Sequence, residues 1–248
     1  MIWRVLELKS FSCYENMAID EAISEGISNK TSEPTIRFYK WNPSAVSIGR
    51  FQSMEEEVNI KNCDNLNVQY LRRITGGGAV FHDSEGELTY SIIGSEEFFP
   101  KGIRESYKEI CGYLVKGLNR LGICASFAPI NDIVVGNKKI SGSAQSRKNK
   151  VLLQHGTILF NINIKKMFSV LNVSKEKISD KMIASVEERV TSVKNQNPEI
   201  TFDSLYKELL NSFTEGKEVV FGKLTENENL LVKELIEKYK SKEWNFYR

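Results

Sequence analysis

The spacing of apolar residues switches along this chain between two repeats, and that switch limits the folds that it can adopt. A repeat of two, typical of strands, occurs at Ile36 to Phe38, Val68 to Arg72 and Glu87 to Gly94, whereas Ile103 to Leu121 has the repeat of a helix. Further strands are expected at 3–8, 45–49, 152–162 and 219–221, and further helices at 16–29 (N-cap Asn16), 202–213 and 225–241. This mixture predicts an α+β fold with mixed, mainly antiparallel β-sheets flanked by helices.

The composition is that of an ordinary globular domain. Of the 248 residues, 41% are hydrophobic and 27% are charged, and no linker or repeat divides the chain, so we expect a single domain over residues 1–248. A formal net charge of +2 argues against a nucleic-acid surface. No apolar run reaches the roughly 20 residues that span a bilayer, and we see no signal peptide. We therefore expect a cytoplasmic protein without membrane or nucleic-acid partners.

Three consecutive glycines follow one of the expected strands. They lie in the segment Arg72-Arg73-Ile74-Thr75-Gly76-Gly77-Gly78-Ala79-Val80-Phe81-His82-Asp83. Ordering such a run costs backbone entropy. A functional reason for it is a loop that offers its backbone N–H groups to an anion. We interpret the segment as a ligand site in which the arginines supply charge for a phosphate or carboxylate. A flexible turn with two solvated arginines is the alternative, and the absence of GxxxxGK[ST] and GxGxxG patterns excludes P-loop and Rossmann sites.

An expected hairpin carries the next chemical groups. Asp132 stands at a strand start, and Mg²⁺ favours carboxylate and phosphate oxygens together. Lys138 and Lys139 follow the two-residue loop Gly136-Asn137, and because successive strand residues face opposite sides, only one of them can point into a pocket. There it would neutralise charge on a carbonyl or phosphate. An ordinary hairpin with two exposed lysines is the alternative.

The remaining candidates are a histidine and the cysteines. His155 lies in an otherwise apolar strand, where a hydrogen-bonded core histidine is the first interpretation and a ligand contact the second. Cys13, Cys63, Cys111 and Cys124 lack the spacing of a metal site, so we expect reduced, mostly buried thiols.

Taken in order, these segments resemble the lipoate–protein ligase A family, within the wider group of biotin/lipoate ligases and lipoyl/octanoyl transferases. The resemblance covers nearly the whole chain. The matching segments are Asn16 to Ala22, Arg37 to Tyr39, Gly49 to Gln52, Arg72 to Asp83, Asn131 to Ile133, Lys139 to Ala144, His155 to Thr157, Ser185-Val186, Arg189 to Thr191 and Glu243 to Phe246.

The resemblance implies activation of lipoate with ATP and Mg²⁺ to lipoyl-AMP, followed by transfer to a lysine of a lipoyl carrier domain. That carrier would be the lipoyl domain of a 2-oxoacid dehydrogenase complex or the glycine-cleavage H protein. Lys139 would be catalytic, at the acyl carbonyl and the phosphate, and Asn131 and Asp132 would handle the phosphate and its Mg²⁺. The lipoyl-adenylate would lie against Arg73, Gly76, Gly77, Gly78, Ala79, His82, Ser141, Gly142, His155, Gly156 and Thr157.

Two other hypotheses stay open. The chain ends soon after Trp244-Asn245, where many family ligases continue into an accessory domain, so a ligase of this kind is expected to need a separate accessory subunit. The same ending fits an octanoyl or lipoyl transferase, which takes the acyl group from a carrier protein without ATP, through a cysteine on a longer loop upstream of the motif lysine. Cys124 lies fifteen residues before Lys139, but we interpret it as a buried structural thiol, since a reactive cysteine needs an exposed electropositive setting. A non-catalytic lipoyl-binding protein is the third hypothesis.

Overall fold

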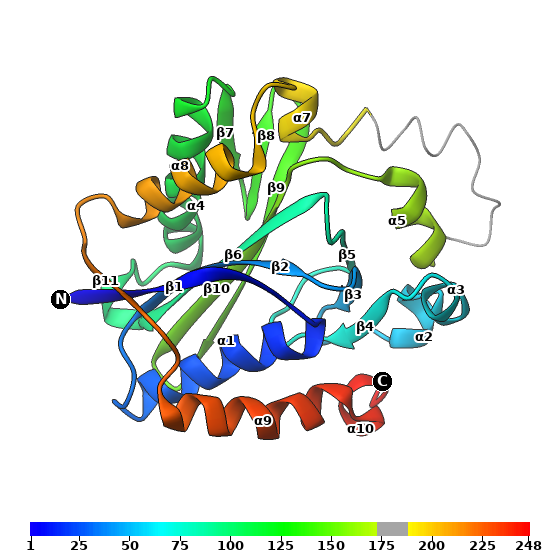
Figure 1. Cartoon of the computed structure of the whole chain (residues 1–248), viewed down its shortest axis with the longest axis horizontal. Coiled ribbons are helices and arrows are strands. Elements are labelled where there is room, and N and C mark those ends of the chain that lie inside the picture. The colour runs from blue at the N-terminus through cyan, green and yellow to red at the C-terminus, as the bar shows by residue number, and fades with distance from the viewer. Residues whose placement is uncertain (173–187) are drawn as a thin grey trace.

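An eight-stranded sheet runs through the centre of the protein, as seen in a computed structural model that describes residues 1–172 and 188–248 (Figure 1). Its strand order is β11-β1-β2-β6-β10-β9-β8-β7. The strands are β1 (Ile2–Phe11), β2 (Thr35–Trp41), β6 (Glu87–Ser95), β7 (Ala125–Ala128), β8 (Asp132–Val135), β9 (Lys138–Lys148), β10 (Val151–Leu159) and β11 (Glu218–Gly222). Strand β1 runs parallel to β11 and β2, and all other neighbours are antiparallel. The expected mixed, mainly antiparallel α+β fold is confirmed.

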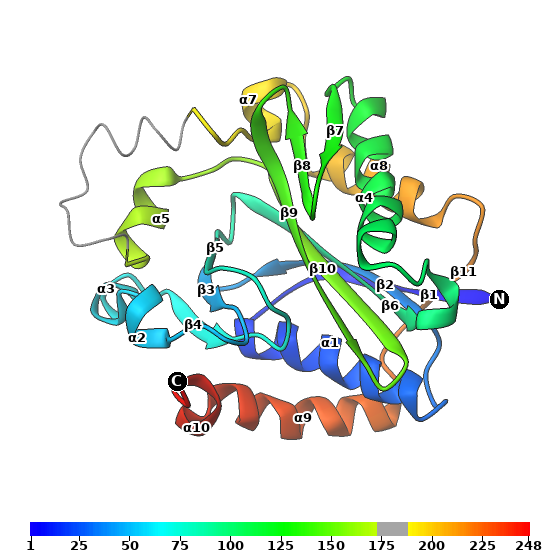
Figure 2. The same cartoon turned by 180° about the vertical axis from the view of Figure 1, so that it is seen from behind.

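Helices cover both faces of this sheet (Figures 1 and 2). Helices α1 (Cys13–Ser28) and α9 (Glu226–Lys240) pack together on one face, and α4 (Ile103–Arg120) and α8 (Phe202–Thr214) on the other. The alternation within β2 explains why two cores form. Phe38 points to α8, with its ring 5.3 Å from that of Phe213, whereas Tyr39 joins the core beneath α1.

A second, three-stranded sheet adjoins the large one. Its order is β4 (Gln69–Arg72), β3 (Ala45–Ile48), β5 (Val80–His82), and the short helices α2 (Met54–Glu57), α3 (Ile60–Asn65) and α5 (Ile164–Val170) help to bury its apolar side chains. The triple glycine lies in the connection between β4 and β5. The small sheet therefore holds both ends of the expected ligand loop.

Several element boundaries differ from the sequence expectation. Helix α1 begins three residues earlier than predicted, because Ser12 is its N-cap and forms a capping box with Glu15, while Asn16 is buried and its amide donates to the Lys40 carbonyl. Strand β9 continues far beyond the predicted hairpin and turns into β10 through Asn149-Lys150, both with positive φ. The hairpin around Gly136-Asn137 is confirmed. Three short elements that the sequence did not predict are η1 (Glu96–Phe98), α7 (Val193–Gln196) and α10 (Lys242–Asn245).

Ser185-Val186 fall outside the described residues, and the single domain over 1–248 stays a prediction. In the part of the chain that the structure describes, no helix combines the length and the apolar character that crossing a membrane requires.

Candidate active site

A cavity of about 370 Å³ is lined by residues of both sheets and by the glycine loop between β4 and β5. Much of its wall is apolar, which with a few converging polar groups is typical of small-molecule sites. The apolar part comprises Met17, Trp41, Phe81, Leu159, Ile162, Met167 and Leu171. The cavity also brings together most of the residues expected from the sequence, namely Arg73, Gly77, Gly78, Ala79, His82, Asn131, Lys139, Gly142, His155, Gly156 and Thr157.

Three expected site residues lie off this lining. Gly76 lines a neighbouring groove on the other side of the loop, Ser141 is buried in β9, and Asp132 stands behind Lys139. The glycine run is therefore divided, with only Gly77 and Gly78 on the cavity. Gly77 adopts a φ of +95°, in the region that favours glycine. Glycine is also required at Gly49, where a Cβ would stand 2.0 Å from the Gly77 carbonyl oxygen.

Arg73 supports the glycine loop from within the protein. Its Nη2 donates to the carbonyls of Gly76 and Gly78 at 2.7 and 2.8 Å. Its Nη1 donates to the carbonyl and the hydroxyl of Ser47, and its Nε to Thr75 Oγ1 at 3.1 Å. Burial lowers the pKa of Arg73 to about 10, so it stays charged at neutral pH. Because all five guanidinium donors are used inside the protein, Arg73 holds the loop, and its direct contact with a ligand stays a prediction.

The neighbouring Arg72 is fully buried and points to the other side of β4. Its Nε donates to the Trp244 carbonyl at 3.1 Å and its Nη2 to the Asn245 carbonyl at 2.9 Å. The Asn245 side chain in return accepts from the backbone N–H of Arg72 at 2.7 Å. Arg72 therefore joins the strand before the glycine loop to the last helix, α10, and does not reach the cavity.

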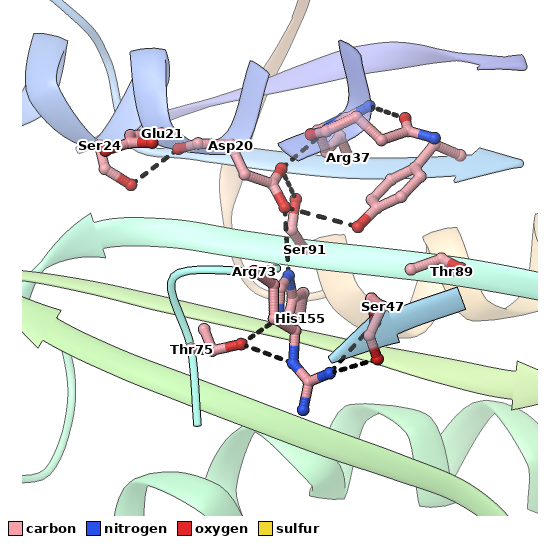
Figure 3. Close-up of polar contacts among 12 residues, drawn as sticks. Asp20, Glu21, Ser24, Arg37, Ser47, Arg73, Thr75, Thr89, Ser91 and His155 are labelled. Carbon is pink, nitrogen blue, oxygen red and sulfur yellow. Dashed lines mark hydrogen bonds and ion pairs between the residues drawn. The ribbon is translucent and has the colours of Figure 1, made fainter. Parts of the chain in front are cut away.

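Each histidine of the site is held by a carboxylate on one side and a hydroxyl on the other. His155 Nε2 lies 2.8 Å from Thr75 Oγ1, and His155 Nδ1 lies 3.4 Å from Asp20 Oδ2 (Figure 3). Burial lowers the pKa of His155, which favours a neutral ring. Both of its nitrogens have partners, so the buried, hydrogen-bonded histidine expected from the sequence is confirmed, and the same ring lines the cavity.

His82 repeats this arrangement on the small sheet. Its Nε2 lies 2.8 Å from Ser47 Oγ and its Nδ1 lies 2.8 Å from Glu87 Oε1, while its ring stacks on Trp41 with centroids 3.9 Å apart. Arg73 donates to both hydroxyls, Ser47 and Thr75 (Figure 3). Because these hydroxyls contact His82 and His155, one buried guanidinium links the two histidines. We expect this network to fix the walls of the cavity.

Asp20 anchors the network in helix α1. Its Oδ1 lies 2.8 Å from Arg37 Nη1 and accepts from Ser91 Oγ at 2.8 Å (Figure 3). Burial alone would raise the pKa of Asp20, but Arg37 and His155 outweigh it, so that the pKa lies below its usual value. Asp20 therefore carries a negative charge that matches the buried Arg37.

Of the two cations that line the cavity among the described residues, Arg73 is buried and Lys139 is partly exposed. Its Nζ lies 2.7 Å from Asp132 Oδ1, and the lysine side chain is 43% exposed. Gly142 stands directly opposite Asp132 across the two strands, and a Cβ there would lie 2.7 Å from Lys139 Nζ. Glycine at 142 therefore leaves the room through which Lys139 reaches Asp132. As expected from alternation, only one of the two lysines points into this cavity, because Lys138 lines a different cleft.

The groups around Asp132 do not fit the expected Mg²⁺ site. Its carboxylate is engaged by Lys139, and no group of three or more His, Cys, Asp or Glu side chains that could hold a metal occurs within residues 1–172 and 188–248. Mg²⁺ usually binds through one or two carboxylates together with substrate phosphates, and the one carboxylate expected to hold it here is already paired with Lys139.

The cysteines correct one sequence interpretation. Cys13, Cys63 and Cys111 are buried, but Cys124 is exposed, so its expected burial is wrong. It precedes β7, the outermost strand of the sheet, where only a short turn follows α4 and little covers it. Among the described residues no cysteine lines the cavity. Burial raises the pKa of Cys111 to about 11, which keeps that thiol protonated.

Several lining residues were not singled out from the sequence. Ser47, Glu87 and Thr89 line the cavity, and Thr89 Oγ1 links the Glu87 carboxylate to the indole N–H of Trp41. Asp20 and Thr75 lay inside matched segments, but nothing in their spacing distinguished them from neighbours. An isolated Glu at the start of an apolar strand was the one available signal for Glu87, because a buried carboxylate requires a partner.

Comparisons with known proteins agree on the family. Residues 12–214 match the profile described as "Lipoyl protein ligase A/B catalytic domain". The chain is 39% identical to the octanoyltransferase LipM of Clostridioides difficile over 267 residues, covering 98% of each chain, and 33% identical to that of Staphylococcus aureus, again covering 98% of each. It resembles the bi-partite lipoate protein ligase of Thermoplasma acidophilum, with a TM-score of 0.88, 31% identity and coverage of 99% and 96%. A lipoate-protein ligase A bound with ATP gives a TM-score of 0.84 at 30% identity, with 99% of each chain covered.

The curated relatives correct the main functional expectation. They are named octanoyltransferases, which contradicts the expected ATP-dependent lipoate ligase and favours the transferase alternative. ATP is bound in a similar solved ligase, but the relatives' names do not support ATP or Mg²⁺ as cofactors here. With a profile match over most of its length and relatives aligned end to end, the chain belongs to the lipoyl protein ligase A/B catalytic-domain family.

Proposed function

We propose that this protein is an octanoyltransferase, which moves a medium-chain acyl group from the thioester of a carrier protein to a lysine of a lipoyl domain without ATP. The names of the curated relatives support the acyl group and the reaction class. A lipoyl domain as acceptor is supported by the E2 lipoyl domain studied with the similar bi-partite ligase. We expected an accessory subunit only for the ATP-dependent ligase, so the transferase proposal does not require one.

The observation that carries the proposal is an ammonium group at the edge of a largely apolar cavity. Side chains such as Met17, Phe81 and Met167 offer the acyl tail an apolar wall, and Lys139 stands among the polar lining. The ion pair with Asp132 orients the Lys139 side chain, and its ammonium retains other N–H groups for a ligand. An apolar wall for the acyl chain and an ammonium group for the carbonyl oxygen together suit an acyl thioester.

The chemistry is the replacement of a sulfur by a nitrogen at that carbonyl. The amine of the acceptor lysine attacks the carbonyl carbon, and negative charge develops on the oxygen. Lys139 would stabilise this oxyanion, with the backbone N–H groups of the loop at Gly77 and Gly78 as further donors. The C–S bond then breaks, the amide forms, and the proton lost by the amine ends on the departing thiol. The cavity walls would exclude water, which would otherwise hydrolyse the thioester.

The direct test is the intact mass of an apo lipoyl domain after incubation with the purified protein. One reaction contains octanoyl carrier protein without ATP, and the other contains free octanoate, ATP and Mg²⁺. We expect an octanoyl mass increase in the first reaction and none in the second. An increase that depends on ATP and free acid, with no transfer from the carrier, would overturn the proposal.

Replacing Cys124 by alanine should leave the transfer rate within about twofold of the unchanged protein. Cys124 is exposed but lies outside the cavity lining, so its thiol is not placed to receive the acyl group there. The measurement is the initial rate of acceptor acylation at saturating octanoyl carrier protein. A loss of more than about tenfold in a folded variant would assign the nucleophile to Cys124 and replace direct attack by a two-step transfer.

Replacing Gly142 by alanine should lower the transfer rate by about 10- to 100-fold, because the new Cβ displaces the end of Lys139. The clash involves a flexible side-chain terminus, so the thermal midpoint should change little. Gly112→Ala in α4 is the matched control, since a Cβ there meets no atom within 4 Å. An unchanged rate for Gly142→Ala would show that the position of Lys139 does not limit the reaction.

A further inference from the structure

A second cleft opens directly beside the acyl cavity, and the two share five lining residues. Its volume is about 1090 Å³. The shared residues are Asp83, Gly86, Ile162, Asn163 and Val190. A molecule that fills the cavity with one end can therefore extend into the cleft with the other. The proposed function requires such a molecule, since a carrier delivers its acyl group on a long arm.

The cleft differs from the cavity in chemistry. Its lining is mostly polar and contains three lysines, Lys138, Lys165 and Lys166, against two acidic residues, Asp83 and Glu85. Amide side chains of Asn161, Asn163 and Asn195 complete much of the rest. Lysine ammonium groups in one cleft suit a phosphate, and amide side chains suit a ligand that itself contains amide groups. The cavity suits the apolar end of the same molecule.

The cleft has a fixed base and one fixed cation. The Gly86 carbonyl accepts from the backbone N–H groups of Phe160 and Asn161 at 2.9 and 3.0 Å, and a Cβ on Gly86 would stand 2.2 Å from the Asn161 carbonyl oxygen. Lys166 Nζ donates to Ser44 Oγ at 3.1 Å and lies over the Phe81 ring, which is itself part of the cavity wall. One ammonium is therefore held where the apolar and polar spaces meet.

From this arrangement we propose that the cleft binds the phosphopantetheine arm of the acyl donor, with its phosphate at the lysines and its thioester at Lys139. The inference rests on the proposed function. Lys165 is the residue that tests it best. Its side chain is exposed at the cleft, and within the described residues no ion pair engages it. Coenzyme A and a carrier protein present the same phosphate, so the test includes both.

The experiment compares two small donors that differ only in the phosphate, octanoyl-phosphopantetheine and octanoyl-pantetheine. For the unchanged protein we expect kcat/KM to be about tenfold higher with the phosphorylated donor, the ratio that one charge-assisted contact supplies. Lys165→Ala should remove most of this advantage through KM and leave octanoyl-pantetheine unaffected. Lys233→Ala, an exposed lysine on α9, is the matched control and should change neither value.

The outcomes separate this inference from the proposed function. Equal kcat/KM values of the unchanged protein for the two donors would overturn phosphate recognition. An equal decrease in kcat/KM for both donors in Lys165→Ala would overturn it as well. In both cases acyl transfer itself would persist. A lack of transfer from every thioester, octanoyl carrier protein included, would overturn the proposed function and the inference with it. A selective Lys165→Ala loss with octanoyl carrier protein assigns the arm to the carrier, and the same loss only with octanoyl-coenzyme A assigns it to the coenzyme.

Discussion

Replacing Lys139 by methionine should lower the rate of acyl transfer by about 100- to 1,000-fold, the loss expected when one donor to a developing oxyanion is removed. Methionine keeps much of the side-chain volume but cannot donate to the carbonyl oxygen. Because Lys139 is 43% and Asp132 32% exposed, the ion pair contributes little to folding. The measurement is the initial rate of lipoyl-domain acylation, beside a urea denaturation curve for the same variant.

The control for Lys139 is a lysine far from the cavity. Lys233→Met on α9 removes the same charge from an exposed site and should leave the rate unchanged. Lys139→Arg should recover part of the rate, since it restores a cation but replaces the compact ammonium by a larger, planar guanidinium. A Lys139→Met variant that retains more than about a tenth of the activity would exclude Lys139 as the main stabilising group of the reaction.

Replacing Asp20 by alanine should lower the free energy of unfolding by about 3–5 kcal/mol, the range seen when one partner of a buried ion pair is removed. Asp20 and Arg37 are 1% and 3% exposed, so the arginine would be left as a buried charge without its carboxylate. Ser91 and His155 lose a partner in the same step. Chemical denaturation measures the change, and the acylation rate should fall because His155 lines the cavity.

An exposed carboxylate provides the contrast. Asp203 pairs with Lys207 on α8, with both side chains 68% exposed, and Asp203→Ala should leave the unfolding midpoint unchanged. If Asp20→Ala costs no more than Asp203→Ala, then Arg37 reaches water or another acceptor, and the buried network is not what fixes the cavity walls.

The fold was predicted where periodicity was strong. Helix α4 and the hairpin at Gly136-Asn137 follow from local patterns, and both occur as expected. The three residues before Asn16 were missed because the Ser12 to Glu15 capping box is a weaker signal than the apolar stripe that follows it. The short strand β5 was also missed, since three residues carry too little periodicity to identify.

The sequence predicted most of the residues that belong to the site, but not the contacts among them. The glycines, the histidines and Lys139 could be singled out from their residue types, and most of them line one cavity. What each contacts depends on residues far along the chain. His155 pairs with Asp20, 135 positions away, and Arg73 donates to the carbonyls of its own loop. Long-range pairing of this kind leaves no local pattern in one sequence.

The function was mistaken for a related reason. The segments that match the family form the cavity that ligases and transferases of this group share, so they do not distinguish ATP from a thioester as the source of activation. The exposure of Cys124 could not be predicted from the sequence either, because burial next to an edge strand depends on which other segments cover it. Comparison with whole relatives supplied what the motif residues could not.

The link between Arg72 and the residues of α10 has a consequence for how the protein is made. The strand that leads into the glycine loop is completed by Trp244 and Asn245, about 170 positions later in the chain. A ribosome-bound nascent chain that has not yet released those residues lacks the partners of a fully buried guanidinium. Ligand binding should therefore arise only after α10 has left the ribosome, and an insertion directly after α10 should disturb the glycine loop.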